Sequence, residues 1–211
     1  MKSFTMNKTL TALLGALLLT GGANAFAASV DLSVTGKITP SACTPSLAQG
    51  GRVDFGKISA KDLNTDQSTS LPPQTLQLKL TCDGATLAAL EGKDNRAGSN
   101  SNNDDGDFGL GLINDSEKLG FVRLRPLLLM ADGVAGRLIA SYNNGASWGD
   151  QNFLMRDNIV SVADFGSLSP KPFVELSSNL QIEPTIAPAK DLTLTNEVAI
   201  DGSVTLTVHY L

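Results

Sequence analysis

The sequence predicts an all-β protein built as an antiparallel sandwich, and three observations carry this prediction. Short segments of alternating apolar and polar residues recur along the chain, separated by turn signals such as Asp83-Gly84 and Asp201-Gly202. No long helical periodicity is present. Charged residues make up only 18% of the chain while Ser, Thr, Asn and Gly are plentiful, a composition typical of exported β-rich proteins.

The first residues resemble a secretory signal peptide. Lys2 and Lys8 precede an apolar run over residues 10–19, and the small-residue triplet Ala23-Asn24-Ala25 follows it. The run is shorter than the roughly 20 residues that span a bilayer, which disfavours the alternative of a membrane anchor. We expect residues 1–25 to be removed, with cleavage after residue 25 or residue 27, and no membrane span afterwards.

An alternating strand follows directly. One face carries Val30, Leu32, Val34, Gly36 and Ile38. We expect residues 26–39 to form an N-terminal extension and residues 40–211 to form the β-sandwich. The pattern alone leaves open whether this strand completes its own domain or a neighbouring copy.

Further strand signals run through the sandwich region. Leu76, Leu78, Leu80 and Cys82 share one face of a predicted strand, which places Cys82 inward. The other predicted strands cover 52–56, 108–113, 121–125, 136–142, 173–176 and 179–186. The best helix candidate, Thr86 to Leu90, is about one turn long.

Residues 92–107 contain many Asn, Asp, Ser and Gly residues and almost no apolar ones, which predicts an exposed, mobile loop. Asp104, Asp105 and Asp107 lie close together, but the spacing and closing glutamate of a calcium-binding EF-hand are missing. A solvated loop is therefore the better interpretation.

The chain closes on another alternating strand. Val204, Leu206, Val208 and Tyr210 fall on one face, and Thr205, Thr207 and His209 fall on the other. Such a strand has no following segment to pair with, so another element must cover its free edge.

Charge and cysteine usage limit the classes of partner. The net charge is −5, and the expected leader holds two lysines and no acid, so nucleic acid and anionic membranes are disfavoured as partners. Cys43 and Cys82 are the two cysteines. An oxidising exported compartment makes an intrachain disulfide the default, with free thiols or an intermolecular bridge as alternatives.

No catalytic constellation is recognisable. The single histidine, His209, has no nucleophile or orienting carboxylate in a known motif, and neither a nucleophile elbow nor a phosphate-binding loop is present. We expect no enzyme activity, no metal site and no cofactor. Tyr142 and Trp148 flank the turn Asn143-Asn144-Gly145 and could stack on a sugar, although a small core plug is the commoner role for such residues.

The ordering of these features resembles chaperone–usher pilus subunits. A leader precedes an alternating strand with Gly36 near its end, Cys43 follows, Cys82 lies 39 positions on, and the penultimate residue of the last strand is Tyr210. The segments 34–43, 53–58, 94–98 and 108–111 resemble a fimbria-like, beta-fimbrial family of proteobacteria that is largely uncharacterised. One departure is Val198, at a position fourteen from the end where pilins often carry glycine.

The resemblance implies an incomplete immunoglobulin-like sandwich that is completed by a donor strand from another molecule. In this interpretation Val30, Leu32, Val34 and Ile38 enter apolar pockets, and Gly36 sits where no Cβ fits. Val204, Leu206, Val208 and Tyr210 would form one wall of the receiving groove. The implied partners are a periplasmic chaperone, an outer-membrane usher and other pilus subunits.

Two functions follow as expectations. The first is a structural subunit of a surface fimbria, exported through the periplasm of a Gram-negative bacterium and acting in cell adhesion. The second is a self-contained secreted sandwich that binds a glycan or another surface ligand, with the strand at Val30 folded into its own sheet.

Overall fold

The computed structural model describes residues 33, 35, 42–102, 104 and 106–211. The expected leader and the donor-strand residues Val30, Leu32, Val34, Gly36 and Ile38 lie outside the described residues. One compact unit spans residues 38–211, and the following paragraphs concern this unit alone.

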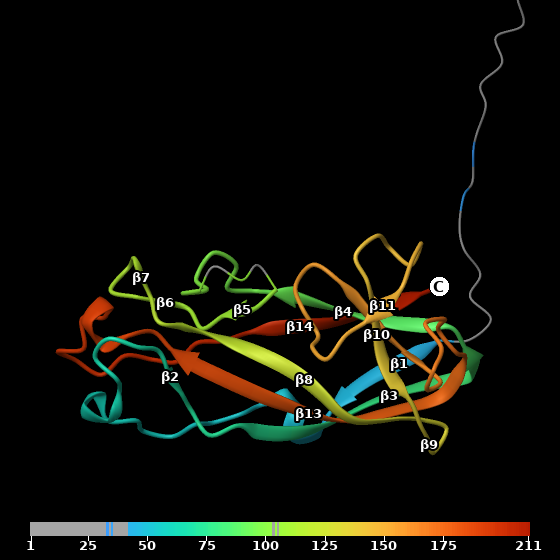
Figure 1. Cartoon of the computed structure of the whole chain (residues 1–211), viewed down its shortest axis with the longest axis horizontal. Helices are drawn as coiled ribbons and strands as arrows, with labels where there is room; N and C mark the ends of the chain where they lie inside the picture. The colour runs from blue at the N-terminus through green and yellow to red at the C-terminus, as the bar shows by residue number, and fades with distance from the viewer. Residues whose placement is uncertain (1–32, 34, 36–41, 103, 105) are drawn as a thin grey trace, which may run out of the picture. The chain divides into compact units, whose positions relative to one another are not determined.

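The described chain is all-β and antiparallel, as predicted (Figure 1). Its strands are β1 Cys43–Leu47, β2 Thr69–Ser70, β3 Gln74–Thr86, β4 Ala88–Asp94, β5 Phe108–Gly109, β6 Leu112–Ile113, β7 Glu117–Lys118, β8 Gly120–Ala131, β9 Val134–Ala135, β10 Arg137–Ser141, β11 Gly149–Asp150, β12 Ile159–Ala163, β13 Phe173–Ile186 and β14 Val204–Tyr210. Short 3₁₀ turns cover η1 Ala48–Gly51, η2 Ala60–Asp62 and η3 Ala189–Asp191. Among these described elements, none is a helix of the length and apolarity needed to cross a membrane.

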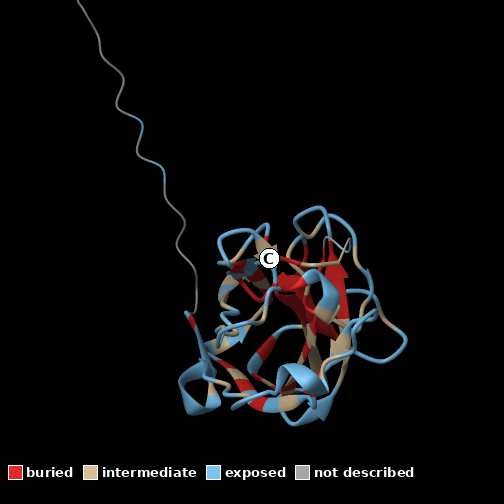
Figure 2. Cartoon of the chain, turned by 90° about the vertical axis from the view of Figure 1, so that its left-hand side faces the viewer, coloured by how far each residue is buried: buried red, intermediate tan, exposed pale blue. Residues whose placement is uncertain are grey.

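Two main sheets make the sandwich. The larger has the order β1-β3-β13-β8-β5, with β2 added to β13 and β9 added to β8, and the second has the order β11-β10-β12-β4-β14. A small hairpin of β6 and β7 stands apart from both. Most of the buried residues lie on the strands, and most of the surrounding loop residues are exposed (Figure 2).

The strand order matches an immunoglobulin sandwich without its last strand. Constant-type immunoglobulin domains place strands A, B, E and D in one sheet and C, F and G in the other. Here β1, β3, β13 and β8 take the order A-B-E-D, while β4 and β14 take the places of C and F. No described strand occupies the place of G beside β14.

The disulfide joins neighbouring strands of the larger sheet. Cys43 in β1 lies directly opposite Cys82 in β3, and their sulfurs are bonded. Both residues are buried, and Leu76, Leu78 and Leu80 share the inward face of β3 with Cys82, as predicted. In the chain-entropy description, closing a loop of about 40 residues in this way stabilises the fold by roughly 4 kcal/mol.

Several predicted elements differ from the structure. The helix candidate at Thr86–Leu90 is wrong, because Thr86 ends β3 and residues 88–94 form β4, whose alternate residues Ala88 and Leu90 pack into the core. The strand predicted at 52–56 is also absent. A left-handed turn at Gln49, Gly50 and Gly51, with φ of 56°, 64° and 73°, turns the chain away from the ladder of β1 before that segment begins.

The polar stretch at 92–107 is more enclosed than its composition predicts. Residues 92–94 extend β4, and Ser99, Asn100 and Asp107 are buried. Arg123 on β8 donates from Nε to both carboxylate oxygens of Asp107 at 3.0 Å, and Asn102 donates to Oδ2 of the same carboxylate at 2.7 Å. The Asn and Asp side chains therefore bond one another and the backbone in place of an apolar core.

Candidate functional groove

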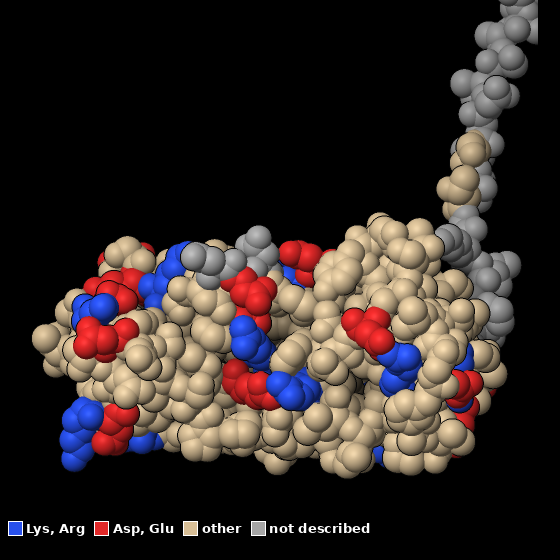
Figure 3. Space-filling view, in the orientation of Figure 1, with Lys and Arg blue, Asp and Glu red and all other residues tan. Residues whose placement is uncertain are grey.

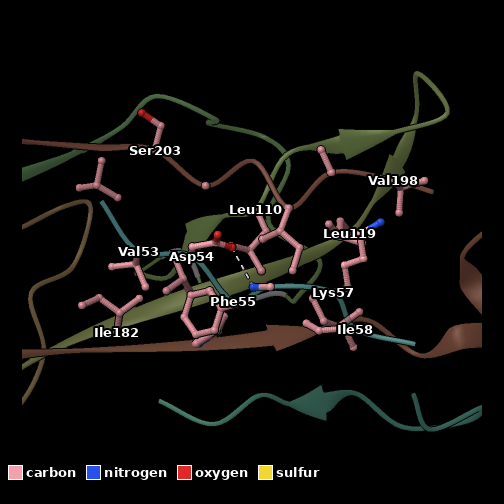
Figure 4. Close-up of a pocket in the computed structure, with 18 of the residues that line it drawn as sticks. Val53, Asp54, Phe55, Lys57, Ile58, Leu110, Leu119, Ile182, Val198 and Ser203 are labelled. Atoms are coloured by element: carbon pink, nitrogen blue, oxygen red, sulfur yellow. Dashed lines mark hydrogen bonds between the residues drawn. The ribbon is translucent and has the colours of Figure 1, made fainter. Parts of the chain in front are cut away.

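An open groove runs between the two sheets beside β14, and its volume is about 670 Å³. Its floor is the inner face of the larger sheet, formed by Leu76, Val122, Leu124, Leu180 and Ile182. Its first wall is the segment 51–58, which follows β1, and its second wall is the segment 194–206, which leads into β14. In the close-up of Figure 4, side chains of both walls, such as Phe55 and Val198, project toward the same space.

β14 supplies the second wall with alternating apolar side chains, as its sequence predicts. Val204 and Leu206 line the groove, and Val208 packs, half-buried, on the core beside them. Thr205 and Thr207 are exposed on the opposite face. The predicted C-terminal strand is therefore present, and Val204 and Leu206 of its predicted inward face line the groove.

The backbone of β14 is satisfied on one side only. It pairs with β4 along its whole length, from Val204 opposite Asp94 to Tyr210 opposite Ala88. At the two ends of this ladder, Asn95 N–H donates to Ser203 O at 2.9 Å and Leu211 N–H donates to Leu87 O at 3.1 Å. In an antiparallel ladder, the backbone N–H and C=O groups of successive residues point alternately toward the neighbouring strand and away from it. On β14, the groups that point toward β4 therefore belong to residues 203, 205, 207, 209 and 211.

The intervening residues therefore direct their backbone N–H and C=O groups away from β4. These residues are Val204, Leu206, Val208 and Tyr210, the same ones whose side chains the sequence places on the inward face. Among the described residues no strand pairs with this edge. An unpaired edge with apolar side chains facing a groove is a template for another strand.

Tyr210, which is 41% exposed, links the end of β14 to β1. Its hydroxyl accepts a hydrogen bond of 2.9 Å from the backbone N–H of Cys43 at the start of β1. This bond joins the end of the second sheet to the edge strand of the first.

The wall residues beyond β14 were not predicted from the sequence. Leu194, Val198 and Ile200 face the groove although residues 194–203 form no strand, and Val53 and Phe55 face it from the first wall. Their alternation of apolar residues was the available signal. This alternation indicated that the side chains are buried, but it could not indicate that no described strand pairs with their backbone.

Polar contacts hold the second wall in place although it has no ladder. Thr193 N–H donates to Oε2 of Glu117 at 2.6 Å, and Asn114 donates to Thr193 O at 2.9 Å. Near β14, Arg96 donates to both oxygens of the Asp201 carboxylate, at 2.8 and 2.7 Å. The wall is thus fixed at both ends by residues of the surrounding loops.

These contacts shift the pKa of the two acids. The hydrogen bond from the backbone N–H of Thr193 lowers the pKa of Glu117, and the hydrogen bonds from the Arg96 guanidinium lower the pKa of Asp201. In each case the partner stabilises the ionised carboxylate. Each contact therefore favours the ionised form of its acid.

One exposed ion pair spans the open side of the groove. Lys57 Nζ of the first wall lies 3.0 Å from Glu197 Oε2 of the second, and both side chains are more than four-fifths exposed. An ion pair this exposed contributes little to stability, so it presents no large barrier to opening.

The charges elsewhere on the visible face are mixed. Figure 3 shows acidic and basic side chains side by side. Two arginines of β8 form ion pairs, Arg123 with Asp107 just before β5 and Arg125 with Glu183 of β13. In the described residues, no group of three or more His, Cys, Asp or Glu side chains is arranged to hold a metal ion. His209 does not face a nucleophile but forms a contact of 2.5 Å with Glu91.

Comparison with known proteins adds a family-level likeness. Residues 32–114 match a family described as a protein of unknown function, DUF1120. Protein GltF of Escherichia coli (strain K12) is 25% identical over 252 residues, covering 99% of both chains. Uncharacterized protein YhcF of the same organism is 24% identical over 220 residues, covering 87% of this chain and 90% of that protein. The chain is thus similar along its whole length to proteins whose names state no activity.

Proposed function

We propose that the chain is a structural subunit of a surface fibre assembled by strand exchange, in which residues 30–38 of one copy fill the groove of the next. The observation that carries this proposal is the free edge of β14. Val204 and Leu206 line the groove with apolar side chains, and Val204, Leu206, Val208 and Tyr210 direct backbone groups to the edge with which no described strand pairs. A strand that enters the groove forms ladder hydrogen bonds and buries its own apolar face in one step.

The proposed donor has matching chemistry. Val30, Leu32, Val34 and Ile38 alternate along it, and the floor beneath the groove is Leu, Ile and Val. Burying each of these side chains contributes about 1.5–3 kcal/mol before the entropy cost of ordering the strand is subtracted. In this proposal a periplasmic chaperone covers the groove before exchange, an outer-membrane usher directs assembly, and the fibre acts in adhesion at the cell surface.

Polymer formation tests the proposal. The chain without residues 1–25 should form SDS-resistant ladders that collapse on boiling, and the same chain without residues 26–38 should form none. Adding a synthetic peptide of residues 28–40 to the shortened chain should give a one-to-one complex with a raised melting temperature. Ladders formed by the shortened chain, or a peptide that leaves its melting temperature unchanged, would contradict donor-strand exchange.

A pair of substitutions in the donor tests the register. Gly36→Phe should slow polymer formation at least severalfold, since the bulky ring enters the face that packs into the groove. Thr35→Phe is the matched control, because residue 35 lies on the opposite face of the alternating strand. Equal rates for the two variants would show that the predicted face is not the one buried.

A further inference from the structure

A second cavity lies on the other side of the five-stranded sheet, away from the groove. Its volume is about 270 Å³. Ala88 and Leu90 of β4 pack into the core, so Glu91 between Leu90 and Gly92 faces the outer surface, opposite Ile159 of β12. We call this cavity the outer pocket; its lining includes Glu91, Ser141, Tyr142, Asn144, Asp157 and Asn158.

The lining is almost wholly polar. Every lining side chain except that of Ile159 carries a hydrogen-bonding group. Acceptors come from the carboxylates of Glu91 and Asp157 and from the amides of Asn144 and Asn158, and the guanidinium of Arg156 also lines the pocket and supplies donors. Because Arg156 lies beside the two carboxylates, and Glu91 already contacts His209, the lining offers no strong attraction to a charged ligand. The described residues also offer no metal-binding cluster. A lining of mixed donors and acceptors suits a neutral ligand that both donates and accepts hydrogen bonds.

Tyr142 adds an aromatic surface to the rim. The residue is 63% exposed. Its hydroxyl is nevertheless held, because Gln151 Nε2 donates to it at 2.9 Å and it lies 3.4 Å from the sulfur of Met155. A fixed and exposed ring of this kind packs on the apolar face of a ligand while the polar groups beside it fix the orientation.

The loop that carries Tyr142 and Asn144 is pre-organised. Ser141 Oγ donates to Asn143 Oδ1 and accepts from Gly145 N–H, both at 2.8 Å, and Asn143 Nδ2 donates to Ser147 Oγ at 2.9 Å. Asn144 and Gly145 adopt left-handed backbone conformations with φ of 55° and 88°. Binding a ligand therefore costs little loop entropy.

Asn158 lies at the base of the pocket and is 3% exposed. Its Oδ1 accepts from Met155 N–H at 3.3 Å, whereas its Nδ2 has no partner among the described residues. A buried amide donor without a partner is costly, so an acceptor that reaches it gains more than an exposed contact would.

We propose that the outer pocket binds one neutral sugar ring of a glycan. A pyranose has hydroxyls that donate to carboxylates and accept from amides, and it has an apolar C–H face that packs on a tyrosine ring. The volume is just below the range of about 300–1,000 Å³ that holds drug-sized ligands, which suits a single ring rather than a long oligosaccharide. The proposal is independent of the groove, because the two sites lie on opposite faces of the sheet.

Saturation-transfer difference NMR on the chain without residues 1–25 tests the site, with D-glucose, D-galactose, D-mannose and N-acetyl-D-glucosamine as separate probes. At least one sugar should give a ring-proton signal. Tyr142→Ala and Asp157→Ala should each raise its dissociation constant roughly tenfold, the size of one lost stacking or charged contact. Phe165→Ala is the matched control, since Phe165 is an exposed aromatic residue outside the pocket, and it should leave the dissociation constant unchanged.

Asp157 is exposed, so its variant should keep the fold even if the Tyr142 variant disturbs Gln151 and Met155. No signal from any of the four sugars would overturn the proposal, as would a signal that survives both pocket substitutions. Repeating the measurement with the donor peptide in the groove separates the two sites, because the sugar signal should not change.

Discussion

At the scale of single residues, Tyr210 connects the two sheets through one hydrogen bond. Its hydroxyl accepts the N–H of Cys43, and this contact links the last strand to the first across the two sheets. The sequence identified Tyr210 as an inward residue of the last strand. It did not predict the bond to Cys43, because strand alternation contains no information about contacts between residues 167 positions apart.

Replacing Tyr210 by Phe should therefore destabilise the fold by about 1 kcal/mol, since a partly buried backbone N–H loses its acceptor. Urea unfolding of the chain without residues 1–25, at concentrations where light scattering shows monomers, measures the change. Tyr142→Phe is the matched control, because the Tyr142 hydroxyl bonds only side chains at the exposed surface. Equal losses in the two variants would show that the contact between Tyr210 and Cys43 does not stabilise the groove.

At the scale of elements, alternation predicted the strands that have one face buried. β3 and β14 are the clearest cases, since each alternates over a full strand length. β12 was not predicted, because all five of its residues are buried and no alternation appears. β1 was not predicted either, since Pro45 lies in it and weakens the strand signal; this short edge strand pairs only with β3.

The candidate site was predicted in part, for a related reason. The β14 residues were identified because they belong to a regular strand. Val198 and Ile200 of the second wall were not, since irregular segments are placed by distant side chains such as Arg96 and Glu117. The donor residues lie outside the described part of the chain and stay a prediction.

The anchoring of the second wall predicts an acid dependence. The Arg96 guanidinium lowers the pKa of Asp201, so the folded state binds its proton less readily than the unfolded chain does. The stabilisation is therefore complete above the ordinary carboxyl pKa of about 4 and is lost as the pH falls through the lowered value in the folded state. Asp201→Asn should remove this contribution and flatten the decline in stability at acid pH.

Thermal unfolding between pH 2 and pH 7 measures this effect. The native chain should lose more stability on acidification than Asp201→Asn does. Asp115→Asn is a suitable control, because the Asp115 side chain forms no hydrogen bond or ion pair among the described residues, and it should leave the loss of stability at acid pH unchanged. If Asp201→Asn loses as much stability on acidification as the native chain does, this carboxylate does not anchor the wall.

At the scale of the whole molecule, the sandwich has the strand order of an immunoglobulin domain, and none of the described strands fills the last position. The first six positions, A to F, are occupied, and the position beside β14 is open above an apolar floor. This arrangement explains why the chain would need a partner strand, and the alternating segment at 30–38 is the proposed source of it. The competing account, in which that segment fills its own groove, requires the same pairing within a single molecule.

Hydrogen exchange at the amides of β14 tests this central claim most directly, because the strand contains its own control. Thr205, Thr207 and His209 bond to β4 and should exchange slowly in every state, whereas Leu206 and Val208 should exchange quickly in a chain without residues 26–38. Adding the peptide of residues 28–40 should slow Leu206 and Val208 and leave the other three unchanged. Slow exchange of Leu206 and Val208 without the peptide, or fast exchange with the peptide bound, would contradict an open groove completed by a donated strand.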